Sequence, residues 1–367
     1  MNVLVWNSWV AHPVGGMERI ALEIALQLHS RKHSVVLVGP YDKAPELRAR
    51  IPANMPYYFF DLYRRRPKPH LALGRLLGRL IRNHKIDVVC AHGSVFASYE
   101  VCRRRSIPHV WTIHGAEARP KGLMGRMKTA AVARVFHGQL SHAVAVSTAT
   151  AEIIHEQFPK LDATHLHVIN NGAPHEAPLL ELPLPRPGPP WQLGFIGRLA
   201  ERKRPLDLVE VARKLDKRLD FKLHVFGEGP LQEPLKAAIA RHHLEDRFVL
   251  HGYWDKGSEG MLGQIQLLVH TDGVEPFGGA LVEAQLSGRP VVAYHVGGNP
   301  DIVEHGATGC LVPLGDIDGF VEAVRTIAEK SFTNFSAAAR ERAIKRFSLA
   351  HMTDKYAALF EHVCAKH

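Results

Sequence analysis

The sequence predicts an α/β protein with two domains, each built around a doubly wound parallel β-sheet. Short apolar runs rich in β-branched residues alternate with amphipathic stretches along the whole chain, and this alternation is typical of βαβ units. The 367 residues also exceed the roughly 250 to 300 at which a single hydrophobic core stops growing. A proline-rich segment divides the pattern in two, so we expect one domain on each side of it.

Ten of the apolar runs are expected to form strands. Six precede the proline-rich segment and four follow it: NVLVW, SVVLVG, IDVVCAH, HVWTIHG, HAVAVS and HLHVINNG, then WQLGFIG, KLHVFGEG, LLVHTDG and PVVAYHVGG. In open parallel sheets, ligands bind beyond the carboxyl ends of the strands, where loops gather and helix N-termini point. We therefore expect the loop edges of the two sheets to face each other across an interdomain cleft.

The proline-rich segment also sets the predicted domain boundaries. Residues 173–190 hold 7 of the chain's 24 prolines, which continue neither a helix nor a central strand, and are predicted to be a linker. The first domain is predicted over 1–172 and the second over 191–349. A C-terminal helix near residues 350–367 could pack back on the first domain.

Composition limits the class of protein. A hydrophobic content of 46% is ordinary for a globular chain, and no run approaches the roughly 18 apolar residues of a membrane helix. The N-terminal stretch has no Lys or Arg before Arg19, so we expect no signal peptide and a cytoplasmic location. The four cysteines form no CxxC pair, and the 24 histidines show no HExxH motif and no cluster with carboxylates at metal-ligand spacing. No metal site is expected.

The net charge of +10 predicts an anionic partner, which could be nucleic acid, anionic lipid or a phosphorylated substrate. A nucleic-acid-binding protein would need aromatic residues interleaved with its basic residues, and the 8% of aromatic residues show no such clustering. The sequence contains neither a GxxxxGK[ST] phosphate loop nor a GxGxxG motif after the first strand, which argues against a P-loop NTPase and a dehydrogenase.

The stretch HTDGVEPFGGALVEAQLSGRP, residues 270–290, predicts an anion site. Gly278 and Gly279 open a helix, and the free amides and positive dipole of such an N-terminus suit a phosphate group. Glu275 precedes the glycines and Glu283 lies within the helix, where carboxylates can accept hydrogen bonds from sugar hydroxyls. Solvated carboxylates without a ligand remain the alternative interpretation of both residues.

Cations for the same anion are expected after the strand WQLGFIG. Arg198 and Lys203 lie in the loop that follows it, where a forked guanidinium and a compact ammonium could both bind phosphate oxygens. In the first domain, Gly15 and Gly16 join the first strand to an amphipathic helix, either as a phosphate-facing loop or as a plain turn. His114 ends another strand at the expected ligand edge, and a purely structural role is its alternative.

These motifs, taken in order, resemble the retaining glycosyltransferases of family 4, which have the GT-B fold of two facing Rossmann-like domains. The resemblance extends over nearly the whole chain and is carried by GGMERIALEIALQL, WTIHGAE, AVSTAT, VINNGAP, GFIGRLAERKRP, LHVFGEGP, the pair Glu275 and Glu283, and GRPVVAYHVGGNPDIVEHGATGCLVP. It implies a nucleotide-diphosphate sugar donor bound mainly by the second domain and an acceptor bound mainly by the first. The resemblance also implies transfer without a metal ion or other cofactor.

The resemblance assigns roles to individual residues. Arg198 and Lys203 would bind the diphosphate, Glu283 the ribose, and Gly16 would approach the diphosphate beside Gly15. Glu275 and the backbone after Phe277 would hold the donor sugar, and His114 would lie beside the anomeric carbon. The donor site so implied comprises Gly15, Gly16, Arg198, Lys203, Glu275, Phe277, Gly278, Gly279, Ala280, Leu281 and Glu283. Arg204 stands where the family commonly has glycine, and would add a cation near the diphosphate or the rim of the cleft.

The sequence leaves alternatives open for the identity of the donor and for the reaction. A UDP-sugar is the favoured donor and GDP-mannose the next, because UDP-sugars are the most widely used donors in this family. A nucleotide-sugar epimerase of the same fold is the near alternative to a transferase, and a nucleic-acid-binding protein is the remote one.

Basic residues concentrate in the first domain, in Arg64–Arg66, residues 71–85, Arg103–Arg105 and residues 119–128. In LALGRLLGRLIRNHK, Arg75, Arg79 and Arg82 share one helical face, while Leu73, Leu76, Leu77 and Leu80 line much of the other. Such a helix either lies on an anionic membrane or packs its leucines into the domain core. We favour a lipid-linked glycan or glycolipid acceptor at the inner membrane face, in bacterial cell-surface glycan synthesis.

Overall fold

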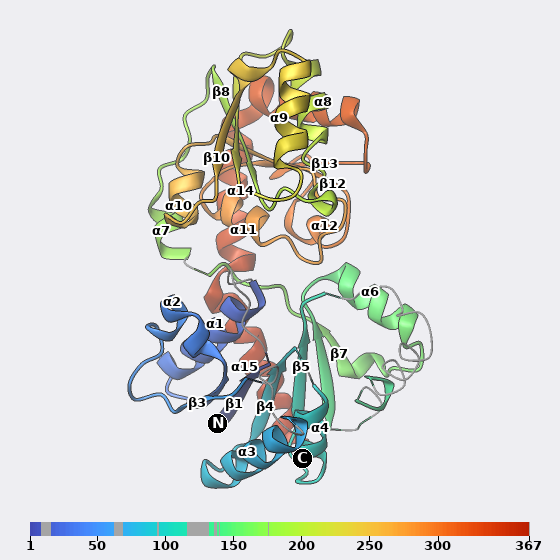
Figure 1. The fold of residues 1–367 in the computed structure, drawn as a ribbon. Helices are drawn as coiled ribbons and strands as arrows, with labels where there is room; N and C mark the ends of the chain where they lie inside the picture. Colours follow the sequence, from blue (N-terminus) through green and yellow to red (C-terminus); the bar gives the residue numbers. More distant parts are fainter. Residues whose placement is uncertain are drawn as a thin grey trace. The chain divides into compact units, whose positions relative to one another are not determined.

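The structure, a computed structural model, divides into two compact units, one formed by residues 1–174 with 349–367 and the other by residues 175–348 (Figure 1). Each unit has its own parallel β-sheet. The described residues are 1–8, 16–61, 69–93, 95–115, 132–135, 138, 140–174 and 176–366. Within them, no helix combines the length and the apolar character needed to cross a membrane.

The first unit contains a seven-stranded parallel sheet. Its strands are β1 (Asn2–Asn7), β2 (Ser34–Gly39), β3 (Tyr57–Phe59), β4 (Val88–His92), β5 (His109–Ile113), β6 (Ser141–Ala145) and β7 (Leu166–Val168). They pair in the order β3-β2-β1-β4-β5-β6-β7. This is the doubly wound Rossmann order with one further strand, and the order reverses between β1 and β4.

Helices cover both faces of the first sheet: α1 (Gly16–Ser30), α2 (Pro45–Arg48), α3 (Pro69–Asn83), α4 (Phe96–Arg103), α6 (Thr148–Gln157) and α15 (Leu349–Ala365). Alternate residues of β1 point to opposite faces, as the period of a strand requires. Val3 and Val5 pack with α1 and α15, whereas Leu4 and Trp6 pack with α3 and α4. The strand reads as a continuous apolar run because both of its faces are buried.

Helix α15 belongs to the first unit, although it follows the whole of the second unit in the chain. Its Tyr356 is buried, and the phenol oxygen lies 2.9 Å from Oγ1 of Thr112 on β5. At the surface, Arg31 after α1 forms a 2.6 Å ion pair with Asp354. The chain therefore returns to complete the core of the unit in which it began.

Helix α3 packs three of its leucines into the core of the first unit. Leu73, Leu77 and Leu80 are each at most 2% exposed and contact the face of the sheet that carries Leu4 and Trp6. The arginines of α3 point into solvent. Of the two interpretations of this helix, the structure supports the one in which its leucines stabilise the domain. The basic stretches at 64–66 and 119–128 lie outside the described residues.

The second unit repeats the same sheet order with six parallel strands. They are β8 (Trp191–Ile196), β9 (Phe221–Phe226), β10 (Phe248–Gly252), β11 (Leu267–His270), β12 (Val291–Tyr294) and β13 (Gly309–Val312). They pair in the order β10-β9-β8-β11-β12-β13, so the reversal falls between β8 and β11. Its helices are α7 (Glu176–Glu181), α8 (Asp207–Leu215), α9 (Gln232–Arg241), α10 (Gly257–Leu262), α11 (Gly279–Leu286), α12 (Asn299–Ile302), α13 (Ile317–Arg325) and α14 (Phe332–Phe347).

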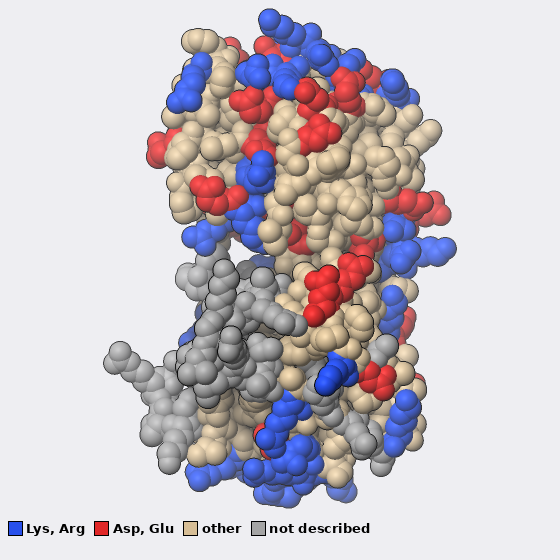
Figure 2. Space-filling model, turned by 90° about the vertical axis from the view of Figure 1, so that its right-hand side faces the viewer, with Lys and Arg blue, Asp and Glu red and all other residues tan. Residues whose placement is uncertain are grey.

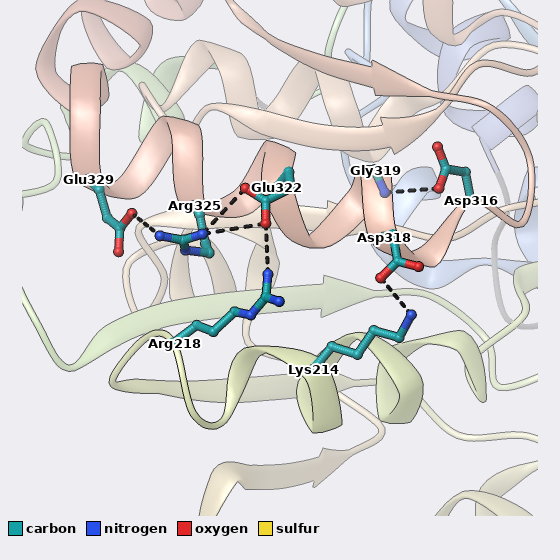
Figure 3. A network of polar contacts seen from close by, with 8 residues as sticks. All are labelled: Lys214, Arg218, Asp316, Asp318, Gly319, Glu322, Arg325 and Glu329. Atoms are coloured by element: carbon teal, nitrogen blue, oxygen red, sulfur yellow. Dashed lines mark hydrogen bonds and ion pairs between the residues drawn. The ribbon is translucent and has the colours of Figure 1, made fainter.

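An exposed network of ion pairs connects α8 to α13 on one face of this sheet (Figure 3). Lys214 contacts Asp318 at 2.6 Å, and Arg218 contacts Glu322 at 2.8 Å. Arg325 extends the network from Glu322 to Glu329. Exposed pairs of this kind contribute about 1 kcal/mol or less each, so the buried face of α8 contributes more to the packing.

The proline-rich segment is held by the second unit. Donors of that unit reach its backbone carbonyls: Arg289 Nη1 donates to Pro183 O at 3.1 Å, Arg340 Nη2 to Leu182 O at 2.8 Å, and Gln266 Nε2 to Arg186 O at 2.5 Å. Prolines have no amide hydrogen but keep their carbonyl oxygens, which suits a segment bound by external donors.

Candidate functional site

Two loops meet at the point where the strand order of the second sheet reverses. One follows β8 and the other follows β11, and these strands are neighbours in the sheet. Three hydrogen bonds join the loops: Gly273 N–H donates to Arg202 O at 2.9 Å, Thr271 Oγ1 to Lys203 O at 2.8 Å, and Arg202 Nη1 to Val274 O at 2.9 Å. Ligands of doubly wound sheets bind at such a reversal point.

The ammonium of Lys203 lies against two carboxylates at this point. Its Nζ is 3.1 Å from Oε2 of Glu275 and makes a shorter contact with Oδ2 of Asp272. His270, at the end of β11, lies behind them, with Nε2 3.5 Å from Asp272 and 3.7 Å from Glu275. Asp272 and His270 are buried, whereas the side chains of Lys203 and Glu275 are 14% and 13% exposed. This group of four is called the Lys203 cluster below.

Charge decides the protonation of the Lys203 cluster. Burial alone would raise the pKa of the Glu275 carboxyl, but the nearby His270 ring and the positive charge of Lys203 outweigh burial and hold this pKa well below its usual range. For His270, burial acts to lower the pKa, and the carboxylates of Asp272 and Glu275 outweigh it, so the pKa is raised. At 3.5 and 3.7 Å these contacts are charge attractions, longer than hydrogen bonds. Glu275 is therefore ionised.

The loop after Glu275 opens helix α11 as the sequence predicts. Gly278 has a φ of 101°, a left-handed conformation that glycine adopts without strain. The first hydrogen bonds of the helix are donated by the amides of Leu281 and Val282 to Gly278 O. The amides of Gly279 and Ala280 come before these donors at the helix N-terminus, where amides have no partner within the helix. Phe277 is buried and anchors the loop edge-on against Phe347. The result is a helix N-terminus with the features of an anion site.

A second glycine pair supports this loop from behind. Gly298 N–H donates to Glu275 O at 2.8 Å, and the backbone of Gly297 passes so close that a Cβ there would lie 1.9 Å from the same oxygen. Gly297 also has a φ of 50°. The position of Glu275 thus depends on the absence of a side chain at Gly297 in the loop after β12.

The other predicted site residues of the second unit are not part of the Lys203 cluster. Arg198 is exposed after β8, and Glu283 is half-buried on α11. Arg204 was expected to add a cation near the diphosphate, but its charge is already paired. Its guanidinium forms a forked pair with Asp207 at 2.7 and 3.2 Å. Its backbone is left-handed, with a φ of 46°, which is the conformation that a glycine at this position would adopt most easily.

In the first unit, His114 pairs with a second histidine at the carboxyl edge of the sheet. Nε2 of His114 lies 2.9 Å from Nδ1 of His92, and Nε2 of His92 lies 3.4 Å from Sγ of Cys90. Burial lowers the pKa of His114 to about 4, so the ring is neutral at physiological pH. Gly16 begins α1, and Gly15 lies outside the described residues.

Two residues of the Lys203 cluster were not predicted as site residues. The expectation that histidines and carboxylates form no group at metal-ligand spacing is wrong, because His270, Asp272 and Glu275 bring one ligand atom each within 4.8 Å of the others. The signal was present in the sequence as His-x-Asp-x-x-Glu, which begins at the last residue of a buried strand. The hydrogen bonds between this loop and the β8 loop hold its carboxylates beside Lys203.

The sequence is similar to known families in both halves. The family described as "Glycosyltransferase Family 4" matches residues 14–177, and the one described as "Glycosyl transferases group 1" matches residues 183–346. Alpha-maltose-1-phosphate synthase of Mycobacterium tuberculosis is 30% identical over 292 residues, which are 71% of this chain and 74% of the relative. The 2-deoxystreptamine glucosyltransferase of Streptomyces kanamyceticus is 27% identical over 312 residues, 78% and 80% of the two chains.

Solved structures have the same arrangement of sheets and helices. A glycosyltransferase of Rickettsia africae superimposes with a TM-score of 0.81 at 19% identity, covering 99% of this chain and 98% of that one. HepE of Anabaena, solved in complex with UDP, superimposes with a TM-score of 0.77 at 20% identity, covering 99% and 100%. At these identities the likeness concerns the fold.

Proposed function

The chain belongs to glycosyltransferase family 4 and has the GT-B fold, and from this premise we propose that it transfers a sugar from a nucleotide-diphosphate donor to an acceptor hydroxyl with retention of configuration. One observation carries the proposal. The Lys203 cluster and the open N-terminus of α11 belong to loops that meet at the reversal point of one sheet, so that a cation, an ionised carboxylate and free amides are presented by adjoining segments.

The binding roles follow the chemistry of each group. Lys203 and Arg198 neutralise the diphosphate, while the amides of Gly279 and Ala280 donate hydrogen bonds to its oxygens. Glu275, held ionised, accepts hydrogen bonds from hydroxyls of the donor sugar, and Glu283 from the ribose. In the first unit, His114 stands beside the anomeric carbon as a neutral ring, and Gly16 lets the backbone approach the diphosphate.

Bond making and bond breaking take place on the same face of the sugar. The bond between the anomeric carbon and the diphosphate oxygen breaks as the acceptor oxygen bonds to that carbon, and the acceptor proton passes to the departing phosphate oxygen. No protein base is required. Lys203 and Arg198 stabilise the charge that develops on the diphosphate, which is the role a divalent ion would otherwise have, so we propose that transfer needs no metal.

UDP-sugars are the donors we favour, with GDP-mannose next. A thermal-shift panel of UDP-, GDP- and ADP-sugars tests this choice. The true donor should raise the melting temperature, because a ligand at 100 times its dissociation constant stabilises the native state by about 2.7 kcal/mol. Hydrolysis of the stabilising donor, followed with and without candidate acceptors, then tests the reaction. No shift with any nucleotide sugar would contradict the proposal, and full turnover of the donor into an epimer without acceptor would favour an epimerase.

We propose a lipid-linked glycan or glycolipid as the acceptor, with cytoplasmic membrane contact through the basic surface of the first unit. Figure 2 shows Lys and Arg side chains gathered at the end of this unit where α3 lies. Because Leu73, Leu77 and Leu80 are in the core and Leu71 is the one exposed leucine of α3, membrane contact there would rest mainly on charge. Arg75, Arg79 and Arg82 are exposed.

Liposome flotation measures this contact. Each basic side chain near an anionic surface contributes about 1 kcal/mol, so replacing Arg75, Arg79 and Arg82 by glutamine should weaken partitioning about a hundredfold. Neutral vesicles serve as the control and should not be bound by either form of the protein. Equal flotation with anionic and neutral vesicles at physiological salt would contradict membrane contact without affecting the proposed reaction.

A further inference from the structure

The Lys203 cluster contains a set of metal ligands around a lysine. We propose that His270, Asp272 and Glu275 form a site for a divalent transition-metal ion of the Zn²⁺ class, which binds by displacing the ammonium of Lys203. The three residues lie on one short segment at the end of β11. Each offers one ligand atom, and all of these atoms lie within 4.8 Å of one another.

The spacing fits a small tetrahedral ion. Nε2 of His270 lies 3.5 Å from Oδ2 of Asp272 and 3.7 Å from Oε2 of Glu275. Ligand atoms bound about 2.0 to 2.2 Å from a tetrahedral Zn²⁺ are about 3.3 to 3.6 Å apart. Small side-chain movements therefore bring the three atoms onto one ion, and water can supply the fourth ligand.

Unpartnered buried atoms point to a ligand independently of the spacing. Both ring nitrogens of His270 and Oδ1 of Asp272 are buried and have no hydrogen-bond partner in the described part of the chain. His270 is 1% exposed and Asp272 is fully buried. Buried polar atoms without partners cost free energy, and coordination of Nε2 and of the Asp272 carboxylate would recover part of that cost.

Lys203 occupies the position of the cation in this structure. Its ammonium contacts the same two carboxylate oxygens, Asp272 Oδ2 and Glu275 Oε2, that face His270. A lysine side chain is long and flexible, and this one is partly exposed, so the ammonium can leave for water. Metal binding is thus a competition between a divalent ion and a tethered monovalent one.

The donor set selects the class of ion. One imidazole and two carboxylates suit Zn²⁺ and Co²⁺, whereas Mg²⁺ and Ca²⁺ prefer six or more oxygen ligands. A bound ion would take Glu275 away from the donor sugar and Lys203 away from its partners. If the proposed function holds, the ion therefore inhibits transfer, and this consequence rests on that function while the binding itself does not.

Calorimetric titration of the full chain with ZnCl₂ at neutral pH tests the site. Asp272→Asn removes a charged ligand and should weaken binding by about tenfold or more, a difference of about 1.4 kcal/mol. Lys203→Met removes the cation that competes for the two carboxylates, so it should tighten binding to a similar degree. Lys203→Arg is the matched control, because it keeps the cation and should show no such gain.

The same titration contains the results that would overturn the proposal. Unchanged affinity in Asp272→Asn places the ion elsewhere, and this variant decides the matter if Lys203→Met does not fold. The histidines of the first unit are the competing location, since Nδ1 of His142 lies 3.1 Å from Nε2 of His167. His167→Asn should leave the affinity unchanged, and a loss of binding in that variant would assign the ion to the first unit.

Inhibition is measured separately from binding. Zn²⁺ should lower transfer by the wild-type chain, and a chelator should restore it. Failure of every nucleotide sugar to stabilise the protein would contradict the proposed function while leaving the calorimetric result intact. Stabilisation by a nucleotide sugar with no zinc affinity at the Lys203 cluster would overturn only the metal site.

Discussion

If the proposed function holds, Lys203 serves both the empty and the donor-bound state of the site. Its ammonium balances Asp272 and Glu275 when no anion is present. A bound diphosphate would offer the same cation further charge-assisted partners. Because a carboxylate left buried without a cation is costly, the His270 ring beside both acids is well placed to take over part of the compensation.

At the residue scale, replacing Lys203 and replacing Glu275 should have different effects on turnover and on nucleotide binding. Lys203→Ala should lower turnover at saturating donor by about 10²- to 10³-fold, the loss expected for one preorganised partner of the transition state. Glu275→Ala should also cut transfer sharply but leave the binding of free nucleotide diphosphate almost intact, because its proposed partner is the sugar. Steady-state kinetics and calorimetry with the nucleotide diphosphate provide the two measurements.

Two outcomes would contradict these roles. Near-normal turnover of Lys203→Ala would remove this residue from the proposed role. Parallel losses of transfer and of nucleotide binding in Glu275→Ala would place its carboxylate beside the nucleotide.

At the scale of elements, the loop after β12 holds the loop after β11. The backbone of Gly297 passes the carbonyl of Glu275 at a distance that excludes any side chain. Gly297→Ala should therefore destabilise the second unit by about 2 to 4 kcal/mol, from the left-handed φ and the clash together. Urea unfolding measures this loss.

Gly279→Ala is the matched control for stability. A Cβ there would meet no atom within 4 Å, and alanine is favoured in a helix. The stability should stay within about 0.5 kcal/mol of the wild type or rise. Equal stability of the two alanine variants would show that the contact with Glu275 does not hold the loop.

Elements also show where prediction from the sequence ends. All ten predicted strands are present, and the three that were not predicted, β3, β10 and β13, are edge strands of their sheets. Central strands are buried on both faces and read as continuous apolar runs. The edge strands β3 and β10 are largely half-buried. Strand β13 is buried, but it begins with glycine, which weakens the apolar pattern of its sequence GCLV.

For the whole molecule, one strand order used twice explains the placement of the site. Both sheets follow the Rossmann order, so each has one reversal point at its carboxyl edge. In the second unit this point brings the β8 and β11 loops together, although Lys203 and Asp272 are 69 residues apart in the chain. In the first unit it lies between β1 and β4, beside the histidine pair formed by His92 and His114.

By itself the sequence determined the two parallel-sheet domains, the helix that begins at Gly279, and the candidates Lys203 and Glu275. These features follow from local patterns, because the burial of a strand and the conformation of a glycine can be predicted from the residues next to them in the sequence. Only the tertiary structure decided which charged groups pair with one another. His270 and Asp272 joined Lys203, and Arg204 paired with Asp207, because such contacts depend on which strands are neighbours and on how far each loop bends over them.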